Sequence, residues 1–118
     1  QEIGVLSERV VSLLGLSLQS GQPIYLGQSN IAHMLNRHPA DYARYGQYIP
    51  VILSAPDYVG ENPTDGSIEY VKDFQINREF VKVAVRLSGG GALYARSLYV
   101  LNHNRVINFI QKGTLKRV

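Results

Sequence analysis

Side chains suited to proton transfer gather in one short stretch of the chain, HMLNRHPADYARYG. It contains His33 and His38, and histidine is the side chain whose unperturbed pKa lies nearest to neutral pH. Arg37 follows His33 by four residues, so an intact helix places both on one face. Each histidine alone fits a structural role more readily, His33 as a surface residue and His38 as a helix-end residue favourable to the dipole. Pro39 disfavours helical geometry at His38, so this ring is free to turn elsewhere.

Cationic and hydroxyl side chains recur in two later segments that alternate as strands do. In SIEYVKDF, Lys72 shares a face with apolar residues, so it either snorkels to water from the sheet margin or is held in a site. In ALYARSLYVL, strict alternation puts Ser97 and Tyr99 on one face and Arg96 on the other, unless a bulge re-aims the arginine. The face of Ser97 then also carries Leu93, Ala95 and Leu101.

These residue types suit the cleavage of RNA without a metal ion. A base removes the 2′-hydroxyl proton, an acid protonates the 5′-oxygen, and cations stabilise the charged phosphorane. Histidines suit the proton steps, lysine or arginine suits the phosphate, and serine or tyrosine hydroxyls can bind it. We therefore expect no metal and no cofactor.

Other chemistries have less support. The chain has no cysteine, and its two neighbouring histidines are five residues apart instead of the four of a helical zinc pair. The SGGG segment joins two strands, whereas a phosphate-binding loop leads from a strand into a helix. The G-x-S-x-G motif, which holds the nucleophilic serine in hydrolases of the α/β-hydrolase fold, is absent.

Length and charge narrow the range of partners. The chain has 118 residues, enough for one domain, and no apolar run approaches the ~18 residues of a membrane span. Residues 1–79 carry all nine acidic residues and a net charge of −4, whereas residues 80–118 carry seven lysines and arginines and no acid. A segment this basic predicts a polyanionic or acidic partner, with a merely solvated surface as the alternative.

Periodicity predicts the elements that position these residues. Helical spacing indicates a helix over residues 3–14, a second from the N-cap Ser29 to Arg37, a third from Pro39 and a short one from Pro50. The second helix has a predicted buried stripe of Ile31, Met34 and Leu35. Alternation then indicates four strands with short antiparallel connections, and a final helix that ends at Gly113. The predicted fold class is α+β, with the helices on one face of an antiparallel sheet. The four predicted strands are DYVGE, SIEYVKDF, FVKVAVRL and ALYARSLYVL.

Residues 29–101 resemble the phage- and toxin-associated branch of the barnase–EndoU–colicin–RelE superfamily of RNases. The resemblance lies in SNIAHMLNRHP, LYARSLYVLN and, most specifically, PDYVGENPTDGSIEYVK. It implies N-terminal helices packed on a curved antiparallel sheet of about four to five strands, a short C-terminal helix and a metal-independent RNase site. It also implies that residues 1–118 are a single domain, the C-terminal toxin module of a longer protein of the contact-dependent growth inhibition type, and the initial glutamine agrees with this.

The resemblance also implies roles for particular residues. His33 is expected to act as general base or acid, and His38 as a second proton carrier or a substrate contact. Ser97 and Tyr99 are expected to position the phosphate. The expected phosphate-binding cations are Lys72 and Arg96, and the expected RNA backbone contacts are Arg37, Arg44 and Arg86.

The function implied by the resemblance is that of a tRNA-cleaving toxin that leaves a 2′,3′-cyclic phosphate. We expect such a module to be secreted or delivered from a cell surface and to act in the cytoplasm of a target bacterium. An acidic immunity protein is its expected partner, and a host activating factor is compatible with the resemblance. The alternatives are a non-catalytic RNA-binding or phage accessory domain on the same fold, and a protein-binding module whose basic tail docks an acidic partner.

Overall fold

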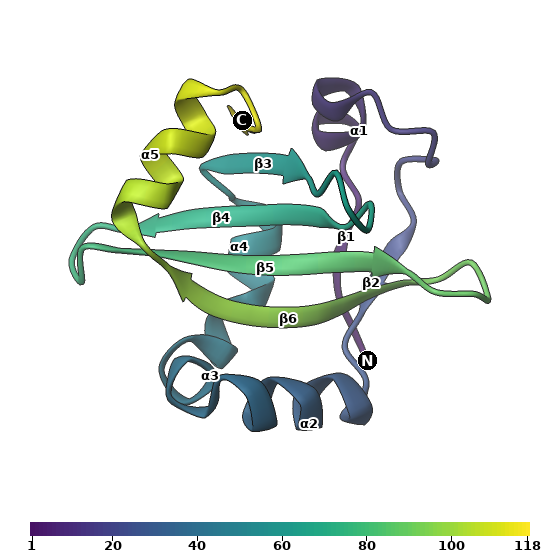
Figure 1. Cartoon of the computed structure of the whole chain (residues 1–118). Helices are drawn as coiled ribbons and strands as arrows, with labels where there is room; N and C mark the ends of the chain where they lie inside the picture. The colour runs from purple at the N-terminus through teal and green to yellow at the C-terminus, as the bar shows by residue number, and fades with distance from the viewer.

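The chain folds around one seven-stranded sheet in the order β1-β2-β6-β5-β4-β3-β7 (Figure 1). The computed structural model describes all residues, 1–118. All neighbouring strands are antiparallel except β2 and β6, which are parallel. The strands are β1 (Glu2–Val5), β2 (Pro23–Tyr25), β3 (Tyr58–Glu61), β4 (Ile68–Phe74), β5 (Glu79–Leu87), β6 (Leu93–Leu101) and β7 (Leu115–Arg117). The helices are α1 (Glu8–Leu14), α2 (Gln28–Arg37), α3 (Pro39–Tyr45), α4 (Ile49–Ser54) and α5 (His103–Gln111), with a 3₁₀ turn at Gly46–Tyr48.

The α+β class and the four central strands agree with the sequence prediction, but the sheet has more strands than the expected four to five. The additional strands, β1, β2 and β7, have only three or four residues each, too few to show a clear alternation. The single helix expected over residues 3–14 is wrong. Its first part is β1, and the helix begins only after Ser7, whose hydroxyl accepts a hydrogen bond from Val10 N–H at 3.2 Å.

A glycine in β1 allows a helix to pack closely against this strand. A Cβ atom on Gly4 would lie 3.1 Å from Leu53 Cδ1, so α4 approaches β1 closely at a residue that has no side chain. Gly60 in β3 has a similar role, because a Cβ atom there would lie 2.5 Å from the Thr114 carbonyl oxygen, just before β7. Both short edge strands therefore depend on a glycine.

The sheet has two hydrophobic clusters, one on each face. The main core joins apolar side chains of the sheet, such as Val83, to Met34 of α2 and Ile52 of α4. On the opposite face, Phe80 and Val106 belong to a smaller cluster beneath α5. The N-terminal helices thus share one face, as predicted, but α5 packs on the other. Figure 1 shows α4 behind the sheet, and α5 beside one end of the front face.

The free edge of β6 is covered by helices and not by another strand. β2 pairs only with Leu93 and Tyr94, and further along β6 the helices α2 and α3 pack beside it. In the first turn of α3, Asp41 Oδ2 accepts a hydrogen bond from Val100 N–H at 3.0 Å. This bond satisfies a backbone donor that an edge strand leaves unpaired.

The second predicted helix has a different cap and a narrower buried face than expected. It begins one residue earlier, at Gln28, and Gly27 N–H donates to Asn30 Oδ1 at 2.9 Å. Ser29 is therefore inside the helix and does not cap it. Met34 is fully buried as predicted, whereas Leu35 is 47% exposed because only one narrow side of α2 contacts the sheet.

The Asp41–Val100 bond should contribute measurably to stability. We expect Asp41→Ala to lower the free energy of unfolding by about 1–3 kcal/mol, the range for a hydrogen bond to a charged group. Asp41→Asn keeps an oxygen acceptor and should lose less. Urea denaturation of the three proteins checks this order, and equal losses in both variants would contradict it.

Candidate functional site

A β-bulge at Arg96 decides which residues of β6 face each side of the sheet. Ser97 pairs with Ala84 and Ala95 pairs with Val85, so Arg96 has no partner across the ladder. The extra residue reverses the alternation beyond it. The expectation that Ser97 and Tyr99 share a face with Leu93 and Ala95 is therefore wrong, since those two side chains lie in the main core. Ser97 and Tyr99 do share a face, and it is the opposite one.

Three cross-strand pairs of β5 and β6 form the surface that we call the open face. Directly paired residues of an antiparallel ladder project to the same side, so each pair presents two neighbouring side chains. Ala84, opposite Ser97, is too small to cover the serine, which is partly exposed. The six residues of the open face are the pairs Lys82–Tyr99, Ala84–Ser97 and Arg86–Tyr94.

His38 reaches the open face from the corner between α2 and α3. Its backbone has φ −143° and ψ 64°, outside helical geometry, because Pro39 follows it. The imidazole stacks on the Tyr99 ring with centroids 4.8 Å apart and planes inclined at 26°. The sequence predicted that this ring could turn at the corner, and in the structure it places the His38 imidazole, an acid–base group, against the Tyr99 phenol.

His33 and Arg96 meet in a hollow at the other end of the same strand. The hollow has a volume of about 590 Å³ and is lined by residues of the start of α2 and of β6. Because the bulge removes Arg96 from the ladder, its side chain lies on the side of α2 that carries the exposed His33. The hollow is lined by Gly27, Ser29, Asn30, His33, Tyr94 and Arg96.

Lys82 and Glu69 form an ion pair that sequence reasoning missed, and it lies on the side of the open face, because Glu69 pairs with Ala84 in the ladder of β4 and β5. Lys82 Nζ lies 2.7 Å from Glu69 Oε2, and each side chain is only 12% exposed. Asn62 Nδ2 donates to the same oxygen at 3.3 Å. Burial by itself would lower the pKa of Lys82, but the hydrogen-bonded Glu69 carboxylate and the neighbouring Tyr99 phenol outweigh it and raise that pKa. Lys82 is therefore a fixed cation at neutral pH.

The fixed cation is linked to the histidine through one aromatic ring. Lys82 Nζ lies 4.7 Å from the Tyr99 ring centroid, and His38 stacks on the same ring. A further hollow of about 310 Å³ is bordered by Lys82 and Tyr99 and continues to Arg105 of α5 and to Lys112, just after this helix. The signal in the sequence was the alternation in FVKVAVRL, which puts Lys82 and Arg86 on the side away from three valines.

Not all of the predicted site residues come together. Lys72 pairs with Val81, a main-core residue, so it projects to the covered face, where its Nζ donates to the Ala55 carbonyl at 2.7 Å. Arg44 is engaged by Glu79 at 2.6 Å, and Arg37 is exposed in the last turn of α2. The predicted residues that lie on the open face or along its α2 margin are His33, His38, Arg86, Arg96, Ser97 and Tyr99.

Two further properties concern the chain as a whole. It has no group of three or more His, Cys, Asp or Glu side chains close enough to hold a metal ion. None of its helices has the length and apolar character that crossing a membrane requires.

Comparison with known proteins gives one match. The model of the family described as "phage-Barnase-EndoU-ColicinE5/D-RelE like nuclease3" matches residues 1–108. This range includes all the elements of the open face and extends the resemblance seen at residues 29–101 to the N-terminal strands and α1. No curated protein and no solved structure matches the chain at a significant level.

The environment of Lys82 predicts the effect of removing its partner. In Glu69→Gln, burial is no longer opposed by a carboxylate, so the pKa of Lys82 should fall from its raised value. Lysine ¹³Cε chemical shifts followed against pH measure this change. Glu61→Gln, at an exposed strand end, is the matched control. An unchanged titration of Lys82 in Glu69→Gln would contradict the ion pair.

The same pair gives a pH dependence of stability. Because the pKa of Lys82 is higher in the folded state than its ordinary value, the pair stabilises the fold at neutral pH. That contribution is lost as the pH rises through the raised pKa, above the ordinary 10.5. Unfolding free energies measured across this alkaline range should fall more steeply for the wild type than for Glu69→Gln.

Proposed function

The chain belongs to the phage-associated nuclease family related to barnase, EndoU, colicins E5 and D, and RelE, and from this membership we propose that it is a metal-independent endoribonuclease. The proposed site is the open face together with the α2 margin that carries both histidines. One observation carries the proposal. His33 and His38 flank the part of β6 that holds Ser97, on a surface where Arg86 and Arg96 form no ion pair and the neighbouring Glu69 carboxylate is neutralised by Lys82.

The proposed reaction is an internal transfer at phosphorus. A base removes the proton of a ribose 2′-hydroxyl, and the 2′-oxygen bonds to the adjacent phosphorus atom. The bond from phosphorus to the 5′-oxygen breaks, and an acid protonates the departing oxygen. The products are a 2′,3′-cyclic phosphate and a 5′-hydroxyl. Negative charge that develops on the phosphorane oxygens is stabilised by nearby cations and hydroxyl donors.

We assign the two proton transfers to the two histidines. Along β6, Ser97 lies between Tyr94, which borders the His33 hollow, and Tyr99, on which His38 stacks. The four helical steps from His33 to Arg37 rise about 6 Å and His38 turns away beyond them, which leaves room for a phosphodiester between the two imidazoles. A phosphate bound at Ser97 would therefore have one acid–base group toward each side.

The remaining roles are binding and positioning. Arg96 has no partner in the ladder and is exposed, so its guanidinium is available to a phosphate. The hydroxyls of Ser97 and Tyr99 can donate hydrogen bonds to the same group. Lys82, fixed by Glu69, takes the electrostatic role that the sequence assigned to Lys72. The exposed Arg37 and Arg86 extend the cationic surface along the RNA backbone.

The substrate, the delivery route and the inhibitor are proposed from the family resemblance of the sequence and from the charge of the open face. We propose tRNA as the substrate, delivery to the cytoplasm of a target bacterium as part of a larger toxin, and inhibition by an acidic immunity protein. An acidic inhibitor suits a surface with no carboxylate among its six defining residues.

The purified protein is expected to cleave total tRNA in the presence of EDTA and to leave 2′,3′-cyclic phosphate ends. His33→Ala and His38→Ala should each lower the cleavage rate by about 10²-fold or more, the usual share of a positioned acid or base. Ser97→Ala should lower it by about 10²-fold, the usual share of a hydrogen-bond donor to the developing charge. Gel assays of rate and mass spectrometry of the ends measure this, with circular dichroism to confirm folding.

Matched controls are available for each residue type. His103 contacts Phe80 at 4.8 Å between ring centroids and is not part of the open face, so His103→Ala should remain active. Lys72→Met should also remain active, and its inactivity would move the site to the other face of the sheet. RNA with a 2′-deoxyribose at the cleaved position should stay intact, because it lacks the attacking hydroxyl.

A folded wild-type protein that binds RNA but cleaves no cellular RNA would overturn the enzyme proposal. That result would favour the non-catalytic RNA-binding alternative. Salt dependence of binding does not separate the two functions, because both use the same cations.

A further inference from the structure

A larger hollow lies beyond the open face, at the end of the sheet where β4 turns into β5. Its volume is about 800 Å³, within the usual range for small-molecule sites. One side is formed by residues 43–45 at the end of α3 and residues 47–48 of the following turn, and the other by residues 73–74 at the end of β4 and residues 75–77 of the β4–β5 connection. The proposed reaction does not use this hollow.

Aromatic rings line the hollow and leave one ring surface free. The Phe74 ring lies 4.8 Å from that of Tyr45 and 5.6 Å from that of Tyr48, between centroids. Tyr45 is buried, but Tyr48 is 41% exposed. At the tip of the turn, Ile76 is 99% exposed and also borders the hollow. A flat apolar ligand could therefore stack on Tyr48 and cover Ile76.

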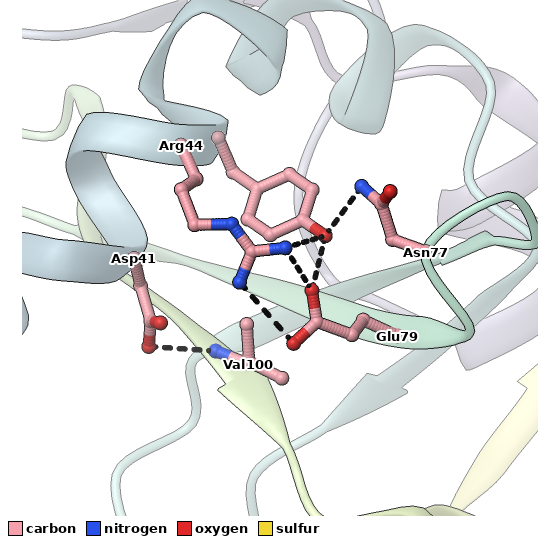
Figure 2. A network of polar contacts seen from close by, with 6 residues as sticks. Asp41, Arg44, Asn77, Glu79 and Val100 are labelled. Atoms are coloured by element: carbon pink, nitrogen blue, oxygen red, sulfur yellow. Dashed lines mark hydrogen bonds and ion pairs between the residues drawn. The ribbon is translucent and has the colours of Figure 1, made fainter.

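A hydrogen-bond network holds one side-chain amide at the hollow (Figure 2). The Tyr45 hydroxyl donates to Glu79 Oε1 and accepts from Asn77 Nδ2 at 3.0 Å. Arg44 binds both carboxylate oxygens of Glu79, at 2.6 and 3.4 Å. The network uses one N–H of Asn77 and leaves its second N–H and its Oδ1 atom without an intramolecular partner. Asn77 thus offers one donor and one acceptor in a fixed orientation.

The charge balance favours a neutral ligand over a phosphate. Arg44 and Glu79 neutralise each other, and the remaining charged residue that lines the hollow, Asp73, would repel an anion. Burial and the hydrogen bond to Glu79 raise the pKa of Tyr45, so its hydroxyl stays protonated and keeps the network intact at neutral pH.

We propose that this hollow binds a nucleobase of the RNA substrate that flanks the cleaved bond, with adenine preferred. Proteins recognise single-stranded RNA by stacking unstacked bases on aromatic rings and hydrogen-bonding to their edges. Tyr48 supplies the ring, and Asn77 supplies the donor–acceptor pair that matches the edge of adenine. The inference rests on the proposed RNase function.

The geometry of α3 sets the spacing between this hollow and the open face. His38 immediately precedes the helix, and Arg44 and Tyr45 end it. Seven helical residues span about 10 Å, a distance that a short stretch of extended RNA can cross. The Asp41–Val100 bond fixes the first turn of α3 beside β6, so the two sites keep a constant separation.

NMR titration of the ¹⁵N-labelled wild-type chain with adenosine, and separately with uridine, tests the proposal without requiring cleavage. Adenosine should shift the side-chain NH₂ signals of Asn77 and bind several-fold more tightly than uridine. Tyr48→Ala should weaken adenosine binding about tenfold or more, the loss expected for one base–aromatic stack, and Tyr48→Phe should restore it. His38→Ala should leave adenosine binding unchanged, because the histidine lies at the other end of α3.

The two proposals can fail separately. If the protein cleaves RNA but millimolar adenosine leaves the Asn77 signals unmoved, the base site is wrong and the RNase function stands. Equal affinity for adenosine and uridine, or full binding by Tyr48→Ala, would also overturn the base site. If adenosine binds as expected but no RNA is cleaved, the RNase function fails, and with it the placement of the base beside a cleaved bond, whereas recognition of adenosine by the hollow stands.

Discussion

The extra residue at Arg96 in β6 is the constraint on which the site depends. Without it, the alternation that buries Leu93 and Ala95 in the main core would also bury Ser97 and Tyr99 there. Buried hydroxyls without hydrogen-bond partners lower the stability of a fold. The bulge lets one strand contribute apolar side chains to the core at both ends while its hydroxyls face solvent. It also releases Arg96 from the ladder toward α2. A single backbone irregularity therefore supplies both the hydroxyl pair and a free cation.

The histidines depend on a second constraint, the unpaired edge of β6. Because β2 pairs with only two residues of β6, the rest of the edge needs another partner, and α2 and α3 provide it through packing and the Asp41 carboxylate. A helix that lies along the edge of a sheet can place its side chains on either face of the sheet. Pro39 separates the two helices at the point where His38 must turn, and the imidazole then contacts Tyr99 on the open face instead of the core.

Much of this arrangement follows from sequence patterns, and what does not has a physical reason. Alternation predicted β4 to β6 and the shared face of Ser97 and Tyr99, and Pro39 indicated the corner at His38. The bulge leaves only a weak mark in the sequence, because the core positions change from Leu93 and Ala95 to Leu98 and Val100. Tyr99 and Leu101 on the opposite face obscure this change, since they are apolar too. Alternation already distinguishes Lys72, which shares a face with apolar residues, from Lys82, which lies on the side away from three valines. The pairing register adds the neighbours, because it puts Lys72 opposite the buried Val81 and Lys82 opposite Tyr99.

The open face has an excess of positive charge because the acidic side chains near it already have hydrogen-bond or ion-pair partners. The chain forms only two ion pairs, Arg44–Glu79 and Lys82–Glu69. Asp41 is used by a backbone N–H group, and so is Asp57, whose Oδ2 accepts from Asp73 N–H at 2.7 Å. The cations around the open face that form no ion pair are Arg86, Arg96, Arg105 and Lys112. Their combined field attracts a polyanion from a distance, whereas Glu69 keeps Lys82 charged beside the Ala84–Ser97 pair, where a phosphate would bind.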